Sequence, residues 1–157
     1  RALEFTILTA ARSGEVRGAR WNEIDFAKAL WTIPAERMKS NREHRVPLCA
    51  CAIEKLRALP RIVGCDLLFP GMHNQPLSDM SLAAVLKRMG FGQFTVHGFR
   101  STFRDWAAEN GYAFEVAEAA LAHKIGLKEV AAYLRTDHLD RRRVLMSDWA
   151  DKLGTSS

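Results

Sequence analysis

Five polar side chains stand out because they occur in stretches that are otherwise apolar or built of small residues: Arg12, His97, Arg100, His123 and Tyr133. Arginine and histidine are seldom placed on apolar faces without a partner. His97 and Arg100 are three positions apart at a predicted helix start, so both can reach one phosphate, and the helix N-terminus adds partial positive charge. Guanidinium groups match phosphate geometry and keep their charge. These residues therefore indicate chemistry at a phosphate group.

Each residue alone also has a plain structural explanation. Arg12 can pair with Glu15 one helical turn later, which stabilises a helix by ~0.2 to 0.5 kcal/mol. His97 can cap a helix beside a surface arginine, and His123 and Tyr133 can be satisfied core residues. The order of these residues along the chain favours a functional interpretation over the separate structural ones. An arginine is followed by a basic hairpin, then by His-x-x-Arg, and then by a histidine and a tyrosine.

The elements that must position these residues follow from the spacing of apolar side chains. The pattern predicts an uncapped first helix from Arg1 to Ala11, so we expect a segment upstream, and a short helix capped by Ser13 that runs to about Ala19. The fold class is α+β, mainly α-helical with a small antiparallel sheet near the N-terminal third. The predicted strands are Trp21–Phe26, Leu30–Ile33 and Arg45–Leu48, and further helices are Ser78–Met89, Phe99–Trp106, Val116–His123, Leu127–Leu134 and one from Leu139.

Composition limits the classes of protein that fit. A chain of 157 residues with 48% hydrophobic content makes about one domain with one core, and it contains neither a membrane-length apolar run nor a signal peptide. A net charge of +5 and a pI near 9.4 favour a polyanionic partner. The odd cysteine count predicts reduced thiols in a cytosolic compartment, and Cys49, Cys51 and Cys65, even with His44, match no zinc spacing. We therefore expect no metal and no cofactor.

From Leu3 to Leu153 the chain resembles the catalytic domain of a tyrosine recombinase of the phage-integrase type. The block from Leu8 to Trp21 is similar to the family's first arginine motif. The family often has glycine near the first arginine and before the later histidine, where this chain has Ala10 or Ala11 and Ala122. Lys39 is assigned by resemblance and hairpin position, among three nearby arginines. The matching motifs are Arg12 with Glu15, Lys39 ahead of Arg45-Val46-Pro47-Leu48, His97-Gly98-Phe99-Arg100, Leu121-Ala122-His123 and Ala132-Tyr133-Leu134-Arg135.

The resemblance implies a metal-independent breaking and rejoining of DNA strands. Tyr133 would attack the phosphate and leave a 3′-phosphotyrosyl bond, and Arg12 and Arg100 would hold the non-bridging oxygens. Lys39 would protonate the departing 5′ oxygen, and His97 would assist proton transfer from the tyrosine, whose free pKa near ~10 makes it a poor nucleophile unaided. His123, the remaining site residue, would hydrogen-bond the phosphate.

The resemblance also implies context. Residues 1–157 would form the C-terminal catalytic domain of a longer integrase whose N-terminal DNA-binding regions are absent, serving integration or excision of a mobile element. The expected partners are double-stranded DNA, further copies forming a tetramer on DNA, and accessory bending or directionality proteins, in the bacterial cytoplasm at the nucleoid and away from membranes. The enzyme would be bacterial or phage-encoded.

Several alternatives stay open on the sequence. A type IB topoisomerase has similar chemistry but needs no paired site, and a non-catalytic DNA-binding module would leave Tyr133 unexplained. The basic windows Glu36–Arg45 and Leu134–Arg143 suit either phosphate contact or solvated surface. The stripe of Leu145, Trp149 and Leu153 packs either on its own core or on a neighbouring protomer.

Overall fold

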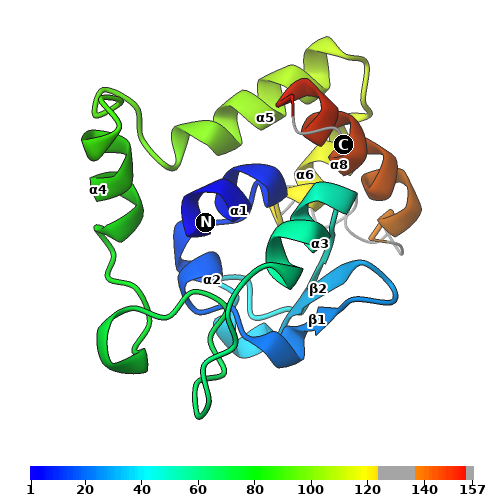
Figure 1. Ribbon diagram of the computed structural model, residues 1–157. Coiled ribbons are helices and arrows are strands. Elements are labelled where there is room, and N and C mark those ends of the chain that lie inside the picture. Colours follow the sequence, from blue (N-terminus) through cyan, green and yellow to red (C-terminus); the bar gives the residue numbers. More distant parts are fainter. Residues whose placement is uncertain (124–136, 155–157) are drawn as a thin grey trace.

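The computed structural model describes residues 1–123 and 137–154 (Figure 1). The predicted helix Leu127–Leu134, and Tyr133 within it, lie outside the described residues. The elements in chain order are α1 (Ala2–Thr9), α2 (Ser13–Arg17), the 3₁₀ turn η1 (Trp21–Glu23), β1 (Ile24–Asp25), β2 (Leu30–Ile33), η2 (Ala35–Arg37), β3 (His44–Pro47), α3 (Ala50–Arg57), η3 (Met72–Asn74), α4 (Ser81–Arg88), α5 (Gly98–Glu109), α6 (Phe114–Ala120) and α8 (Leu139–Lys152).

The sheet is three-stranded and antiparallel in the order β1-β2-β3, as the sequence predicts. Trp31 on β2 pairs with Ile24 on one side and with Val46 on the other. The first strand is shorter than predicted because Trp21–Glu23 forms η1. The Trp21 N–H bonds to the carbonyl of Asp66, 2.9 Å away, instead of to a neighbouring strand. The sheet therefore begins only at Ile24.

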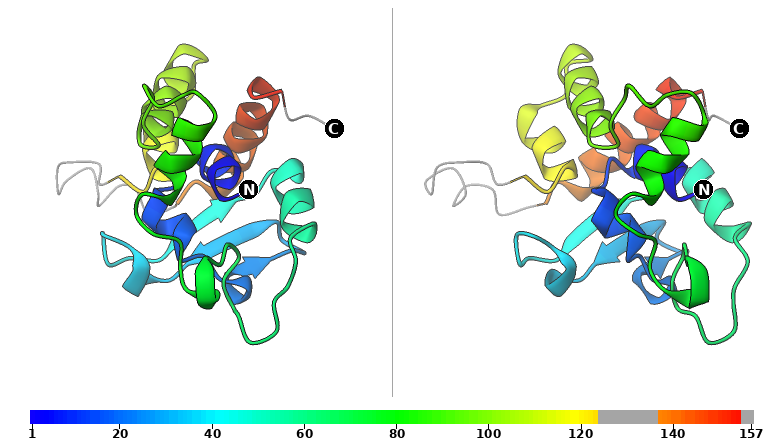
Figure 2. Two further views of the ribbon diagram at one scale, coloured as in Figure 1. Left: turned by 60° about the vertical axis from the view of Figure 1, so that its left-hand side comes forward. Right: turned by 90° about the vertical axis from the view of Figure 1, so that its left-hand side faces the viewer.

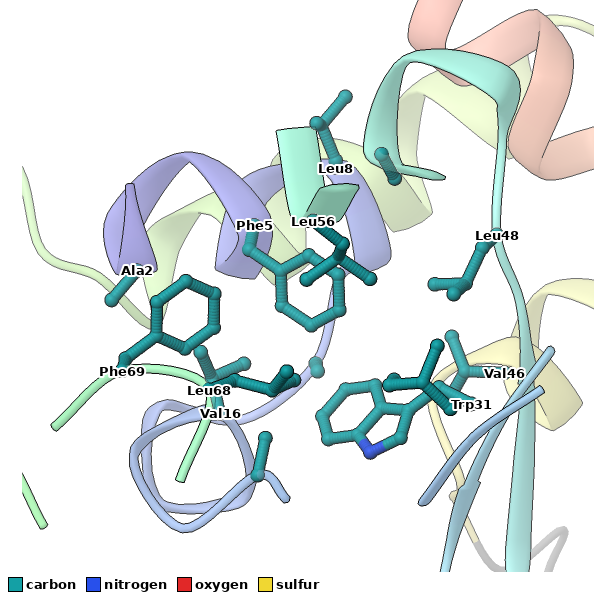
Figure 3. Packing of buried hydrophobic residues seen from close by; sticks show 14 of the residues in the cluster. Ala2, Phe5, Leu8, Val16, Trp31, Val46, Leu48, Leu56, Leu68 and Phe69 are labelled. Atoms are coloured by element: carbon teal, nitrogen blue, oxygen red, sulfur yellow. The ribbon is translucent and has the colours of Figure 1, made fainter. Parts of the chain in front are cut away.

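The larger core lies between α1, the sheet and α3 (Figure 3). Phe5 of α1 lies between Trp31 and Phe69, with ring centroids 5.3 and 5.5 Å away. Trp31 is fully buried, and Leu56 of α3 is 1% exposed. Burying side chains of this size contributes about 1.5 to 3 kcal/mol each. This core fixes the ends of α1 and the β2–β3 hairpin relative to each other.

A second core joins α5, α6 and α8 on the other side of α1 (Figure 2). Phe103 and Trp106 of α5 pack on Trp149 of α8, with centroids 5.4 and 5.1 Å apart. The indole N–H of Trp149 donates to the carbonyl of Ile7 at 2.9 Å, which attaches the helical group to α1. Leu145 and Trp149 therefore pack on the chain's own core, whereas Leu153 is 36% exposed.

The lengths of the described helices bear on whether any of them could span a membrane. In residues 1–123 and 137–154, no helix is long and apolar enough to cross a membrane. The longest helix there, α8, has 14 residues, whereas a span needs about 20.

Candidate active site

Five of the six predicted site residues gather around two adjoining pockets. The first pocket, of about 350 Å³, is lined by Arg12, Lys39, His97 and Arg100 among others. The second, of about 490 Å³, shares Arg12 and Lys39 and adds His123. These residues come from both halves of the chain, so the fold brings together what the sequence separates by up to 111 positions. The sixth, the tyrosine, lies outside the described residues.

Arg12 is held by a local motif at the start of α2. The Glu15 carboxylate accepts the main-chain N–H of Arg12 at 2.8 Å and its Nη1 at 2.9 Å. Glu15 is 6% exposed, so this pair is partly shielded from solvent. The predicted Ser13 cap is wrong, because Ser13 is the first helical residue and Arg12 occupies the cap position. The predicted Arg12–Glu15 pair is present and directs the guanidinium to the pocket.

Arg100 is held by main-chain carbonyls instead of a carboxylate. Its Nη1 donates to the carbonyl of Ala10, and its Nη2 donates to that of Leu121 at 2.7 Å. Arg100 is 4% exposed and forms no ion pair with any residue in the described part of the chain. Burial first, and then repulsion from Arg12, lower the pKa of Arg100 to about 10. The group stays charged at neutral pH, and an anion between the two arginines would relieve their repulsion.

His97 occupies the position just before α5, and it does not cap that helix. The hydroxyl of Thr95 accepts the N–H of Gly98 at 3.0 Å and performs that role. The His97 side chain is exposed and lines the first pocket together with Arg100. The His-x-x-Arg spacing thus directs both side chains to the same pocket, as the sequence predicts.

His123 follows α6 and does not belong to it, contrary to the prediction, because the helix ends at Ala120 and Ala122 has a φ of 50°. Its Nδ1 lies 3.0 Å from Oε2 of Glu118, and its Nε2 lies 3.3 Å from Nη2 of Arg100. Glu118 is a buried carboxylate that the sequence prediction missed. The available signal was an acidic residue within an apolar helical face, five positions before the histidine.

Left-handed backbone occurs at two positions where the resembled family often has glycine. Ala10 has a φ of 49° and Ala122 a φ of 50°. For a residue other than glycine, this backbone conformation costs about 1 to 2 kcal/mol, because Cβ comes too close to the following carbonyl oxygen. Each alanine turns the chain sharply beside the site, Ala10 just before Arg12 and Ala122 just before His123. The glycine preference therefore has a backbone explanation at both places.

The charged side chains of the basic hairpin differ in whether they form ion pairs. Arg37 pairs with Glu23 at 2.7 Å, and Arg45 pairs with Asp137 at 2.7 Å. Lys39 is exposed in the β2–β3 turn, and neither it nor Arg42 makes an ion pair within residues 1–123 and 137–154. Lys39 is therefore the hairpin residue with both a position at the pockets and an available ammonium group.

Phosphate contact by the whole C-terminal basic window is not compatible with the structure. Arg142 is 1% exposed, and its guanidinium donates to the carbonyl of Arg45 at 2.6 Å and to the Asp137 carboxylate at 2.9 Å. This arginine fastens α8 to β3 and is shielded from a ligand. Arg141, which pairs with Glu115 at 3.5 Å, remains 57% exposed.

His44 on β3 is a further titratable group that the prediction did not assign to the site. Burial first, and then the charge of Arg142, lower its pKa to about 4. The imidazole is therefore neutral at physiological pH, and it reaches from β3 to the backbone of Ala120, a residue of the second core.

The rival tyrosine, Tyr112, is engaged elsewhere. Its hydroxyl donates to Asp148, and its ring packs on Trp106 with centroids 5.6 Å apart. Burial first, and then the Asp148 carboxylate, raise the pKa of Tyr112 to about 12. This environment disfavours the phenolate and makes Tyr112 a poor nucleophile.

The three cysteines, Cys49, Cys51 and Cys65, are free thiols in the structure. Cys49 and Cys51 have their sulfur atoms 3.0 Å apart. Burial first, and then the hydrogen bond with Cys51, raise the pKa of Cys49 to about 12. Within the described ranges, no group of three or more His, Cys, Asp or Glu side chains is arranged to hold a metal ion.

The sequence is similar to integrases of phages and prophages. The chain is 43% identical over 151 residues to the prophage integrase IntA of Escherichia coli K12, covering 94% of this chain and 37% of that protein. It is 39% identical over 172 residues to the integrase of Enterobacteria phage P4, covering 97% of this chain and 39% of that protein. The chain thus spans under half the length of these relatives.

Solved structures share the fold at lower identity. The crystal structure of XerA recombinase matches with a TM-score of 0.65 and 16% identity, covering 97% of this chain and 55% of that one. A lambda integrase (75–356) dimer bound to a COC′ core site matches with a TM-score of 0.58 and 20% identity, covering 78% of this chain and 49% of that one. These matches confirm the predicted fold. The family model described as "Phage integrase family" matches residues 1–139, and the chain belongs to this family.

Proposed function

We propose that residues 1–157 are the C-terminal catalytic domain of a longer site-specific DNA recombinase that integrates or excises a phage or prophage element. The observation that carries the proposal is the convergence of Arg12, Lys39, His97 and Arg100 on one pocket, where Arg100 is buried without an ion-pair partner in the described ranges. Two guanidinium groups and an available ammonium group suit a phosphodiester better than a neutral or cationic substrate. The names of the prophage and phage relatives support the same conclusion.

The chemistry is a transesterification without metal or cofactor. The Tyr133 hydroxyl oxygen attacks the phosphorus, the bond to the 5′ oxygen breaks, and a 3′-phosphotyrosyl bond forms. His97 assists removal of the tyrosine proton, and Lys39 supplies a proton to the departing oxygen. Arg12 and Arg100 stabilise the charge on the non-bridging oxygens. The 5′ hydroxyl of a partner strand reverses the reaction, so the energy of the broken bond is conserved.

The remaining residue of the set lies at the adjoining pocket. His123 lines this pocket, and its Nε2 lies 3.3 Å from Nη2 of Arg100, one of the two guanidinium groups that would bind the phosphate. The single described alternative nucleophile, Tyr112, is hydrogen-bonded to Asp148 away from these pockets.

The partners of this reaction are double-stranded DNA and further copies of the protein. A lambda integrase that shares the fold was solved as a dimer bound to a core site, which supports DNA as the substrate class and a multimeric assembly. We extend this to a tetramer on paired sites, with accessory bending or directionality proteins, in the bacterial cytoplasm at the nucleoid. The basic composition, with a net charge of +5, supports a strongly salt-dependent affinity for DNA.

The test uses the full-length protein that carries this chain and nicked duplexes spanning the two junctions of its own element. Denaturing electrophoresis should reveal a covalent protein–DNA band that Tyr133→Phe abolishes and the matched control Tyr112→Phe retains. Relaxation of any supercoiled plasmid, without a junction sequence, would favour a type IB topoisomerase. DNA binding with no covalent band would favour a non-catalytic module.

A further inference from the structure

A chain of four side chains runs from the surface of α5 to the buried arginine of the site. Arg104 Nε lies 2.6 Å from Oε1 of Glu118, in an ion pair without hydrogen-bond geometry. Oε2 of the same carboxylate lies 3.0 Å from Nδ1 of His123. The opposite ring nitrogen, Nε2, lies 3.3 Å from Nη2 of Arg100. Arg104 and Arg100 are one helical turn apart on α5, so the chain of contacts closes on the same helix.

Both contacts of the imidazole require the same tautomer. An ionised carboxylate only accepts hydrogen bonds, so Nδ1 must carry the proton that it donates to Glu118. A guanidinium only donates, so Nε2 must offer its lone pair to Arg100. The other neutral tautomer would place an N–H against an N–H of Arg100 and leave a bare Nδ1 facing the carboxylate. The tautomer in which Nδ1 is protonated is therefore the one that fits.

Glu118 has the burial and surroundings that such a role needs. It is 5% exposed, although it lies on a helix whose other buried residues are apolar or small. A buried carboxylate is costly unless it is paired and hydrogen-bonded, and here both oxygens face side chains connected to the site. The charged groups around His123 are Arg100 and Arg104 from α5, Glu118 from α6, and Arg12 and Lys39 across the second pocket.

We propose that Glu118, kept in place by Arg104, is a positioning residue for the strand-cleavage reaction: it fixes His123 with Nδ1 protonated, so that Nε2 accepts from Arg100 and holds that guanidinium toward the phosphate pocket. The assignment rests on the proposed function for its effect on rate, and on the geometry alone for its effect on the ring. Carboxylates behind functional histidines fix ring orientation and tautomer in the same way in metal sites and in serine hydrolases.

The first measurement reads the ring directly, without DNA. Long-range ¹H–¹⁵N spectra of the histidine rings, with His123 assigned through His123→Gln, should show Nδ1 protonated and Nε2 unprotonated at pH 8. Glu118→Ala should shift the ring toward the other tautomer or toward a mixture. A wild-type ring protonated on Nε2, or a spectrum unchanged in Glu118→Ala, would overturn the assignment.

The second measurement is the single-turnover rate of covalent adduct formation on the nicked junction duplex. Glu118→Ala should lower this rate by about 10- to 100-fold, the range seen when such partners of functional histidines are removed, while DNA affinity stays within about twofold. Glu118→Gln keeps the shape and one acceptor oxygen, so it should restore part of the rate. Arg104→Gln removes an ion pair in which the arginine is half-exposed, so it should lower the rate by less than about fivefold.

Glu115→Ala is the matched control, because Glu115 is on the same helix and pairs with an arginine, Arg141, at 3.5 Å. It should leave both the rate and the His123 spectrum unchanged. A folded Glu118→Ala protein that cleaves at the wild-type rate would refute the positioning role. If Glu118→Ala does not fold, the ring spectrum and the rate of Glu118→Gln decide the question. Absence of an adduct from wild type would overturn the proposed function instead, and the ring spectra would still decide the tautomer.

Discussion

Arg12 and Arg100 line the same pocket from different halves of the molecule, and they are held by different means. Arg12 is paired with Glu15, three residues along the chain. Arg100 is buried and bonded to the carbonyls of Ala10 and Leu121, 90 and 21 positions away. The first arginine is positioned by a local motif, and the second by the packing of α1, α5 and α6. The pocket is therefore complete only when the two cores are assembled.

The comparison predicts that the two arginines have similar effects on cleavage but different effects on stability. Arg100→Lys and Arg12→Lys should each lower the rate of adduct formation by about 10²- to 10³-fold, since an ammonium group cannot reproduce two planar contacts to phosphate oxygens. Arg100→Lys should also lower the free energy of unfolding by about 1 to 3 kcal/mol, because it leaves a buried carbonyl unsatisfied. Arg12→Lys should lower it by under about 1 kcal/mol.

Urea unfolding followed by circular dichroism, beside the cleavage assay, tests this pair of effects. Arg42→Lys, on the basic hairpin outside both helices, serves as the control and should change neither quantity. Equal losses of stability in the two arginine variants would mean that the structural contrast between them has no energetic counterpart.

Lys39 extends the comparison to the basic hairpin, because its side chain is exposed whereas that of Arg100 is buried. Lys39→Met should slow cleavage of an ordinary phosphodiester by about 10²-fold, the low end for loss of a general acid. A duplex with sulfur in place of the bridging 5′ oxygen has a leaving group that needs no proton, so it should restore the rate. A Lys39→Met protein that remains equally slow on the sulfur duplex would exclude the general-acid role.

His44 tests the junction between the halves through pH. Its pKa is about 4 in the folded protein and about 6.5 when unfolded, so between these values the unfolded chain binds a proton that the native state does not. Stability should therefore fall as pH decreases from 6.5 to 4, by up to about 3 kcal/mol from this group. His44→Gln should unfold with a shallower pH dependence than wild type in that window. Parallel curves would show that His44 is accessible to protons in the native state.

The smallest expected effect concerns the backbone beside the site. Ala122→Gly should raise the free energy of unfolding by about 0.5 kcal/mol, because glycine adopts a positive φ without strain. Ala119→Gly, in the body of α6, should lower it by about 1 kcal/mol. Thermal unfolding of the two variants compares these signs. A destabilised Ala122→Gly protein would contradict the account of the glycine preference.

The sequence predicted the elements whose signals are local. The strands around Trp31 and the helix from Leu139 follow from alternation and from helical spacing, and both are present. The sequence did not predict α3, although Ile53 and Leu56 are three apart and buried, because the other buried residues of this helix, Cys51 and Ala52, are small and give a weak apolar period. The extent of the helix before His123 was wrong, because a left-handed alanine carries no signal in side-chain periodicity.

The site was predicted only in part, because some of its contacts form only once the chain has folded. The resemblance supplied Arg12, Lys39, His97 and Arg100, which the fold brings to one pocket. Glu118 escaped because its role depends on a contact made only after α6 ends, and a glutamate in a helix resembles a solvated residue. The sequence windows left Arg37, Arg45 and Arg142 open between phosphate contact and solvated surface. The structure pairs each of them with a carboxylate, either Glu23 or Asp137, and the window composition does not show this pairing.

The central claim is that this chain cleaves DNA through a tyrosyl–phosphate bond at Tyr133, and identification of the bonded atoms tests it most directly. The covalent complex formed by the full-length protein on its junction duplex would be digested with trypsin and nuclease and analysed by mass spectrometry, with the strand ends labelled. The account predicts a nucleotide joined through its 3′ phosphate to the peptide that contains Tyr133. Attachment through a 5′ phosphate, or at a residue other than Tyr133, would contradict it.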